Sequence, residues 1–234
     1  MGIELAKAEG GVLAKRVMRN SPAEKGGVKT GDLLLSIDGA AVAVPGDVVR
    51  MVFEKGVGTV VKVRAKRAKA EVTALVTLAE YPGEEAVLRL DKVGTFAPAW
   101  KGVKAVQGDV ADVKKLRGRV VLVAFWASWC GACRLSAPIL NDLHQRLGAQ
   151  GLTVIGLTDD TEEAAAKAIA KLQIKYAVCA TTSADTMSEY GVRSLPTFFI
   201  LDKRGVFREA FVGAQPVENF DKAITKLLKE AAPA

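Results

Sequence analysis

The hydrophobic and polar positions of this chain follow one pattern up to about residue 80 and a different one afterwards. The first part consists of short β-branched runs bounded by charged residues and glycines, such as residues 72–78, and such runs are typical of strands. In residues 61–66 apolar and cationic positions alternate strictly, which predicts a strand with Lys62, Arg64 and Lys66 on one solvated face. We therefore expect a small, strand-rich β domain at the amino terminus.

A Pro-Gly pair among acidic residues ends this pattern at residues 79–84, as is typical of a linker. We expect one domain over residues 1–80, a linker over 81–86 and a second domain over 87–234. In the second domain strands alternate with longer amphipathic segments, which predicts an α/β fold with a mixed central sheet flanked by helices. The expected strands are 120–125, 152–157, 177–180, 197–201 and 206–211, and the expected helices are 131–147, 161–172, 184–190 and 217–229.

Length and charge agree with two ordinary folded domains. A chain of 234 residues, half of them hydrophobic, suits two cores. The net charge of +7 is spread along the chain, with +4 over residues 1–82 and +3 over the rest, so a mildly basic solvated surface is favoured over a nucleic-acid site.

No apolar run approaches the roughly 20 residues that span a bilayer. No signal peptide follows Met1, so either the protein is cytoplasmic or its targeting segment is missing from this chain.

The chemistry of the second domain centres on two closely spaced cysteines, Cys130 and Cys133. They follow the apolar strand at residues 120–126 and open the helical pattern at 131–147. A thiol in the first turn of a helix faces unpaired N–H groups and the positive end of the helix dipole, which favour the thiolate. We therefore predict Cys130 as a nucleophile. Cys133, on the same helical face, is expected to resolve the mixed disulfide that forms.

Two separate motifs, in the expected order, give this domain a family resemblance. The segment Phe-Trp-Ala-Ser-Trp-Cys-Gly-Ala-Cys at residues 125–133 and Ser-Leu-Pro-Thr-Phe-Phe at 194–199 resemble the thioredoxin superfamily. Gly-Thr-Phe-Ala-Pro at 94–98 and Tyr-Gly-Val at 190–192 are most similar to its extracytoplasmic TlpA and ResA type. The similarity spans about residues 87–230.

The resemblance implies a thiol-disulfide oxidoreductase acting on protein disulfides, with an external thiol donor and no cofactor besides the Cys130–Cys133 disulfide. It implies that the Leu195–Pro196 bond is cis and that the backbone of Leu195 can hydrogen-bond an incoming peptide. It places Trp129 beside the nucleophile. It also implies an extracytoplasmic location.

Two acidic residues of the related families are missing. Ala124 stands where thioredoxins keep a buried Asp, and Ser136 stands where ResA-type proteins keep a Glu. Such a carboxylate helps to move the proton of the resolving thiol. Asp159 and Asp160 could replace it, although solvation at a strand end is the simpler interpretation. The Gly-Ala pair between the cysteines offers no imidazole to stabilise a thiolate, which favours a reductase over a strong oxidant.

Other interpretations of the same residues stay open. Cys130, Cys133, Cys179 and His144 could formally form a zinc site, but their spacing disfavours it, and we expect no metal. Cys179 is expected to be a buried small hydrophobe and His144 an exposed helical residue. A peroxiredoxin would need a single peroxidatic cysteine in a different motif. A peptide-binding adaptor whose thioredoxin-like domain is redox-inactive remains the main alternative function.

The amino-terminal domain has its own signature at residues 21–39, which resembles bacterial PDZ domains. The resemblance implies a groove for an extended peptide or a protein carboxyl terminus, which would add to the sheet as a strand. The groove residues would be Gly2, Ile3, Glu4 and Leu5 on the binding strand, with Val48, Met51 and Val52 on a helix. The apolar members of this set could instead be plain core. Because PDZ folds usually have more sequence before this loop, we expect a longer native precursor.

Overall fold

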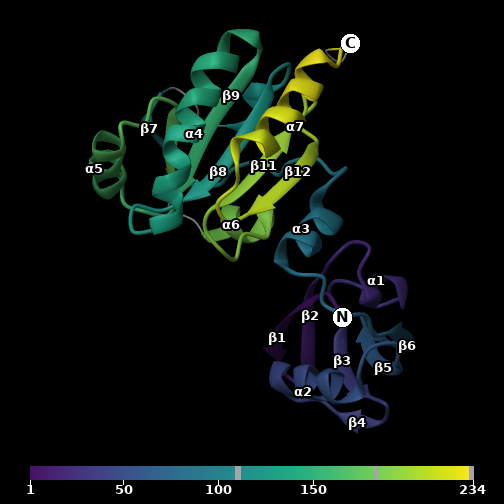
Figure 1. Ribbon diagram of the computed structural model, residues 1–234. Coiled ribbons are helices and arrows are strands. Elements are labelled where there is room, and N and C mark those ends of the chain that lie inside the picture. The colour runs from purple at the N-terminus through teal and green to yellow at the C-terminus, as the bar shows by residue number, and fades with distance from the viewer. Residues whose placement is uncertain (109–111, 182–183, 232–234) are drawn as a thin grey trace. The chain divides into compact units, whose positions relative to one another are not determined.

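The computed structural model describes residues 1–108, 112–181 and 184–231. The chain divides into two compact units, Met1–Asp91 and Lys92–Ala234, each with a hydrophobic core of its own. Figure 1 shows a strand-rich amino-terminal unit and an α/β carboxyl-terminal unit. The last residues of the predicted second domain, 232–234, lie outside the described part of the chain.

The amino-terminal unit is the expected β domain. Its sheet has the order β1-β2-β3-β5-β6, with the short β4 paired to β3, and the neighbouring strands are antiparallel. Val61, Val63 and Ala65 are buried while the intervening cations are exposed, so the predicted alternation is confirmed. The elements are β1 Ile3–Ala8, β2 Gly11–Val17, α1 Pro22–Lys25, β3 Leu33–Ile37, β4 Ala40–Ala41, α2 Pro45–Lys55, β5 Val60–Arg67, β6 Ala70–Thr77 and α3 Glu84–Lys92.

Close packing at the start of the unit requires a glycine. Gly2 has φ +80°, a conformation that residues with a Cβ rarely adopt, and an added Cβ would lie 2.4 Å from the Cβ of Ser21. Its carbonyl accepts a hydrogen bond from the Met18 N–H. Ser21 also caps α1, since its hydroxyl accepts from the Glu24 N–H at 3.2 Å. Gly2 is thus held by the hydrogen bond from Met18 and by close packing against Ser21.

The carboxyl-terminal unit has a mixed sheet in the order β12-β11-β8-β9-β10-β7. The β8/β9 and β9/β10 pairs are parallel, and the remaining pairs are antiparallel. All the predicted strands and helices of this domain are present within a residue or so of their expected ends. The elements are β7 Val103–Gln107, β8 Val120–Trp126, α4 Gly131–Leu147, β9 Leu152–Thr158, α5 Glu162–Leu172, β10 Ala177–Thr181, α6 Ala184–Tyr190, β11 Thr197–Leu201, β12 Phe207–Val212 and α7 Val217–Lys229.

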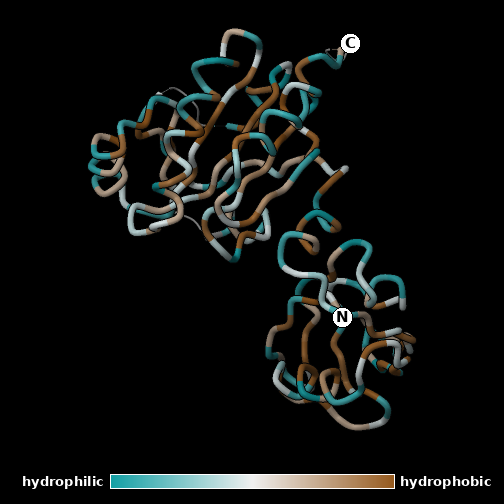
Figure 2. The backbone as a smooth tube through the Cα atoms, in the orientation of Figure 1, coloured by the Kyte–Doolittle hydropathy of each residue, from teal (hydrophilic) through white to brown (hydrophobic). Residues whose placement is uncertain are grey.

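Both faces of this sheet are covered, as all-buried strands require. The alternate residues Leu122, Ala124 and Trp126 of β8 belong to a core shared with α4, α5 and α7. On the other face Phe125 packs against Tyr190 of α6 and Phe199 of β11, with ring centroids 5.1 and 5.9 Å apart. Figure 2 shows brown, hydrophobic stretches along these strands and alternating brown and teal along α5. In the part of the chain described, no helix is long and apolar enough to cross a membrane.

Candidate active site

The two close cysteines lie where the central strand β8 gives way to α4. Cys130 is the N-cap of α4, and its sulfur accepts a hydrogen bond from the Cys133 N–H at 3.1 Å. Sγ of Cys130 and Sγ of Cys133 form a disulfide, with their Cα atoms 5.3 Å apart. Both side chains are about 95% buried. The predicted position of the dithiol at a helix amino terminus is confirmed, and the same N–H that caps the helix can stabilise a thiolate at Cys130.

The other predicted residues of this site differ in exposure. Trp129 precedes the dithiol and is 69% exposed, which leaves a large apolar surface beside Cys130. The Leu195–Pro196 peptide bond is cis, as the resemblance implied. Leu195 is half-buried, and Pro196 is buried. Pro196 and Cys133 line one small cavity, so the structure brings these two residues together from α4 and the loop before β11.

That cavity, behind Cys133, has a volume of only about 10 Å³. Ala124 and Ser136, which stand where the related families keep carboxylates, both line it. The Ser136 hydroxyl donates to the Ala132 carbonyl at 3.4 Å. Trp126 lines the cavity too, and its buried Nε1 has no hydrogen-bond partner. The lining residues are Ala124, Trp126, Cys133, Ser136, Ala137, Leu140, Leu172, Ile174, Tyr176, Pro196 and Phe198.

In the acidic pair after β9, only Asp159 has the solvated position expected of both residues. Asp159 is exposed, but Asp160 is half-buried and binds the loop that leads to Cys130. Its carboxylate accepts hydrogen bonds from the N–H and the hydroxyl of Ser128, at 2.6 and 3.0 Å. Asp160 is not among the residues that line the cavity behind Cys133. The partnership with Ser128 was missed because 32 residues separate them, and no local sequence signal marks it.

The third cysteine and the single histidine lie elsewhere. Cys179 is fully buried in β10, as predicted, and burial raises the pKa of its thiol to about 11. His144, expected to be exposed, is half-buried on α4, and its Nδ1 is buried without a hydrogen-bond partner. The prediction was wrong because His144 borders the buried face of α4, next to Leu140, Leu143 and Leu147. Among the described residues, no cluster of three or more His, Cys, Asp or Glu side chains could hold a metal ion.

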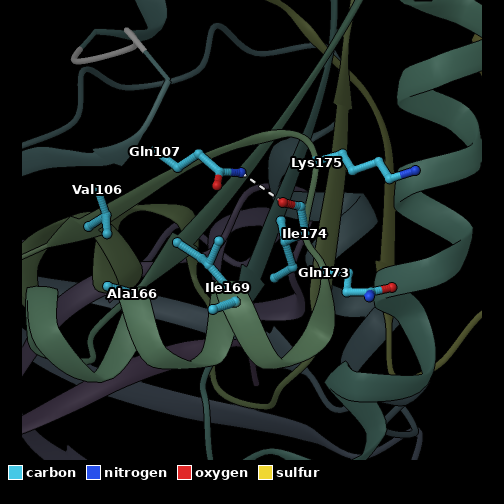
Figure 3. Close-up of a pocket in the computed structure, with 8 residues that line it drawn as sticks. Val106, Gln107, Ala166, Ile169, Gln173, Ile174 and Lys175 are labelled. Carbon is cyan, nitrogen blue, oxygen red and sulfur yellow. Dashed lines mark hydrogen bonds between the residues drawn. The ribbon is translucent and has the colours of Figure 1, made fainter.

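An open hollow of about 720 Å³ lies away from the dithiol, between α5 and the edge strand β7 (Figure 3). Its floor is apolar, with Val106 and Ile169 facing it. The Gln107 amide closes one end by donating to the carbonyls of Ile174 and Tyr176, at 2.9 and 2.8 Å. These bonds hold the β7 edge to the loop after α5. The hollow is therefore explained by the way this edge of the sheet packs, without a ligand.

In the amino-terminal unit, the predicted groove residues lie on two adjoining elements. β1 is an edge strand that pairs with β2, and α2 contacts it. Val48 is 3% exposed and belongs to the core. Ile3, Leu5, Met51 and Val52 are partly buried against that same core, so core packing accounts for part of this set.

Glu4, also on β1, is engaged within the unit. Partial burial would raise the pKa of its carboxyl, but Lys15 and Arg16 outweigh this effect, and the pKa lies below its ordinary value. The Lys15 Nζ–Glu4 Oε1 distance is 3.1 Å. The side chain of Glu4 is therefore turned toward Lys15 and Arg16 of β2.

A dithiol at the amino end of a helix, after the central strand of a mixed sheet and next to a cis-proline, can exchange disulfides by reversible thiolate attack. Proteins of this class are thiol-disulfide oxidoreductases with the thioredoxin fold. The Redoxin family model matches residues 92–225, and the chain belongs to that family. A PDZ domain model matches residues 1–78, which identifies the amino-terminal unit as a PDZ domain.

Individual relatives agree with this assignment. The thiol-disulfide oxidoreductase ResA of Bacillus cereus (strain ZK / E33L) is 29% identical over 137 residues, which cover 58% of this chain and 79% of ResA. A Chlorobium tepidum structure assigned as the thiol:disulfide interchange protein DsbE has a TM-score of 0.53 and 30% identity, over 58% of this chain and 98% of that one. A thiol-disulfide isomerase from Corynebacterium glutamicum shares the fold, with a TM-score of 0.53 and 24% identity over 58% of this chain and 98% of that one.

Proposed function

We propose that this thiol-disulfide oxidoreductase is a reductase of protein disulfides whose PDZ domain recruits a peptide or a protein carboxyl terminus. The observation that carries the proposal is Cys130 at the N-cap of α4, with its sulfur on the Cys133 N–H and the exposed Trp129 beside it. A thiolate in this position is stabilised by the amino terminus of the helix. An apolar side chain next to it suits a polypeptide substrate better than a small polar one.

The proposed cycle begins with attack of the Cys130 thiolate on a substrate disulfide. One substrate sulfur leaves as a thiolate and takes a proton, and the other stays bound to Cys130. Cys133 then attacks Sγ of Cys130, releases the second substrate thiol and leaves the Cys130–Cys133 disulfide. An external dithiol donor returns two electrons. In this scheme Leu195 offers its backbone to the substrate peptide, Pro196 holds that backbone in place, and no other cofactor takes part.

Support for the reducing direction comes from the two residues between the cysteines. Gly131 and Ala132, between the cysteines, carry no group that would stabilise a Cys130 thiolate further. A less stabilised thiolate makes the disulfide harder to reduce, so the dithiol form is the better electron donor. We expect a reduction potential of about −270 mV, as for thioredoxin, rather than about −120 mV, as for a strong oxidant.

The test of this function is capture of the covalent intermediate. Cys133→Ser keeps the nucleophile but removes the resolving thiol, so the variant should accumulate mixed disulfides with protein substrates that dithiothreitol releases. Cys130→Ser is the matched control and should capture none. The reduction potential, from equilibration with glutathione or dithiothreitol buffers, decides the direction. Absence of both the mixed disulfide and a reversible Cys130–Cys133 bond would favour the adaptor function instead.

The PDZ domain is proposed to bind its ligand as an added strand beside β1, with a ligand side chain near Met51 and Val52. Support comes from the edge position of β1 and the half-buried apolar residues of α2 beside it. A peptide selected from a carboxyl-terminal phage library should lose most of its affinity for Met51→Lys. Val49→Lys, on the same helix at a position 63% exposed, should bind it normally. Equal affinity of the two variants would contradict this binding mode.

The location of the protein is proposed to be extracytoplasmic. The support is the likeness of residues 94–98 and 190–192 to the TlpA and ResA type. Fractionation of cells that express the native gene with a carboxyl-terminal tag tests the proposal, and recovery of the tag in the cytoplasm alone would contradict it.

A further inference from the structure

The loop that leads to Cys130 is held through all the polar atoms of one residue, Ser128. Its N–H and its hydroxyl donate to the two carboxylate oxygens of Asp160, at 2.6 and 3.0 Å. Its carbonyl accepts from Nη2 of Arg134 at 3.2 Å. Ser128 is therefore tied both to the segment after β9 and to the first turns of α4.

Asp160 is itself held in one orientation. The hydroxyl of Thr158, the last residue of β9, donates to Oδ2 of Asp160 at 2.8 Å and accepts from the Asp160 N–H at 3.1 Å. Thr158 is fully buried and is paired in register with Trp126 of β8. The carboxylate is thus anchored to the rigid parallel centre of the sheet, and its two oxygens point at the loop.

The position of Ser128 determines the position of the nucleophile. The Cys130 N–H donates to the Ala127 carbonyl at 3.1 Å, which closes a turn with Ser128 and Trp129 at its centre. That turn delivers Cys130 to the N-cap, where its sulfur accepts from the Cys133 N–H. If Ser128 moves, the sulfur moves away from the N–H group that stabilises the thiolate.

We propose that Asp160 is a positioning residue for the nucleophile: through Ser128 it fixes the turn that places Sγ of Cys130 on the amino terminus of α4. The inference rests on the proposed role of Cys130 as nucleophile. Asp160 favours the Cys130 thiolate by fixing its position. The negative charge of Asp160 has the opposite effect, since a like charge near the site disfavours the thiolate. The two effects on the pKa of Cys130 have opposite signs and can be separated.

The experiment compares Asp160→Ala with Asp160→Asn, each combined with Cys133→Ala. Both substitutions remove the charge, but only asparagine keeps an acceptor for the Ser128 N–H and a group that can bond the hydroxyl. The pKa of Cys130 is measured from the pH dependence of its alkylation by iodoacetamide. We expect about a tenfold smaller thiolate fraction at a fixed pH in the alanine variant than in the asparagine variant, which is one pKa unit.

Two controls keep the result interpretable. Asp159→Ala, an exposed neighbour without a bond to Ser128, should match its parent. Thr158→Val should show a smaller change in the same direction as Asp160→Ala, because it releases the carboxylate without removing it. Fast alkylation of Cys130 in the Cys133→Ala parent tests the proposed function separately. Equal Cys130 pKa values in folded Asp160→Ala and Asp160→Asn variants would overturn the positioning role.

The same substitutions at Asp160, made in the enzyme that keeps both cysteines, allow a kinetic measurement. The rate at which dithiothreitol reduces the disulfide should fall about tenfold in Asp160→Ala, since a displacement of about 1 Å can cost roughly 100-fold in rate. Asp160→Asn should restore most of that rate. Failure of asparagine to restore any of it would contradict positioning by hydrogen bonds.

Discussion

The space behind Cys133 is small, and none of the residues that line it carries a charge. Ala124 is 1% exposed, so a carboxyl placed there would be buried without a cation to pair with it. We expect Ala124→Asp to lower the free energy of unfolding by about 3 kcal/mol at neutral pH, because an unpaired buried charge is costly. Ala166→Asp, at an exposed position of α5, should leave it nearly unchanged.

The pH dependence of Ala124→Asp has a definite sign. Burial raises the pKa of the new carboxyl in the folded state, so the folded state binds the proton more tightly than the unfolded state. The variant should therefore approach wild-type stability below about pH 4 and lose stability as the pH rises through its raised folded pKa. Urea unfolding followed by tryptophan fluorescence measures this, because all three tryptophans belong to the carboxyl-terminal unit. A deficit that is independent of pH would contradict the explanation.

Asp32 is the matching case in the amino-terminal unit, a carboxylate that is buried but paired. Burial would raise the pKa of Asp32, but the Arg67 guanidinium and the Lys29 N–H outweigh it, and the pKa lies below its ordinary value. Arg67 binds both carboxylate oxygens at 2.8 Å. This pairing stabilises the fold above about pH 4, and the contribution is lost as the pH falls through the lowered pKa.

Removal of Arg67 should leave Asp32 as an uncompensated charge. We expect Arg67→Ala to lower the free energy of unfolding clearly at pH 7 and less near pH 4, where protonation removes the charge. Arg64→Ala, whose guanidinium is 3.7 Å from Glu71 on the exposed face, should cost well under about 1 kcal/mol. Circular dichroism during urea unfolding reports both, and equal losses would contradict the assigned pairing.

At the scale of elements, sequence patterns predicted most of the carboxyl-terminal unit because its strands are continuous apolar runs between amphipathic helices. The patterns missed the strand β7 of this unit and, before it, the helix α3. Residues 84–92 form α3, although the Pro-Gly pair before them indicated a linker. β7 was missed because it is a short edge strand with exposed lysine and alanine, and its pairing with β10 is a long-range contact. The dithiol was predictable from its local motif, whereas the Asp160–Ser128 link depends on the approach of two loops.

The packing around Trp126 at the end of β8 depends on a glycine at the centre of β9. A Cβ added at Gly156 would lie 2.7 Å from Nε1 of the buried Trp126. We expect Gly156→Ala to destabilise the carboxyl-terminal unit by about 2 kcal/mol through overpacking. Gly148→Ala, in helical conformation with no atom within 4 Å of the added Cβ, should be neutral or slightly stabilising. Tryptophan-monitored urea unfolding compares them, and equal stabilities would contradict the packing argument.

At the scale of the whole molecule, the compact units suggest where the chain can be divided. Asp91, near the end of α3, is 6% exposed and accepts hydrogen bonds from the Arg19 N–H and from Arg16 of β2. We expect a fragment of residues 1–91 to be more stable than one of residues 1–80 by about 2 kcal/mol, because the shorter fragment loses these bonds. Urea unfolding followed by circular dichroism checks this. A fragment of residues 1–80 as stable as residues 1–91 would favour the boundary expected from the sequence.

The burial of Cys179 makes the rate of its chemical labelling a measure of how often the sheet opens. Its thiol is buried in β10, between β9 and the edge strand β7, with a pKa of about 11, so a reagent in neutral buffer reaches it as a thiolate only when β10 separates from these neighbours. The dithiol, by contrast, is expected to react from the intact fold once reduced. The rate of slow labelling at Cys179 therefore measures spontaneous opening of the sheet under native conditions. In the same sample, the amount of fast labelling at the dithiol gives the number of active sites.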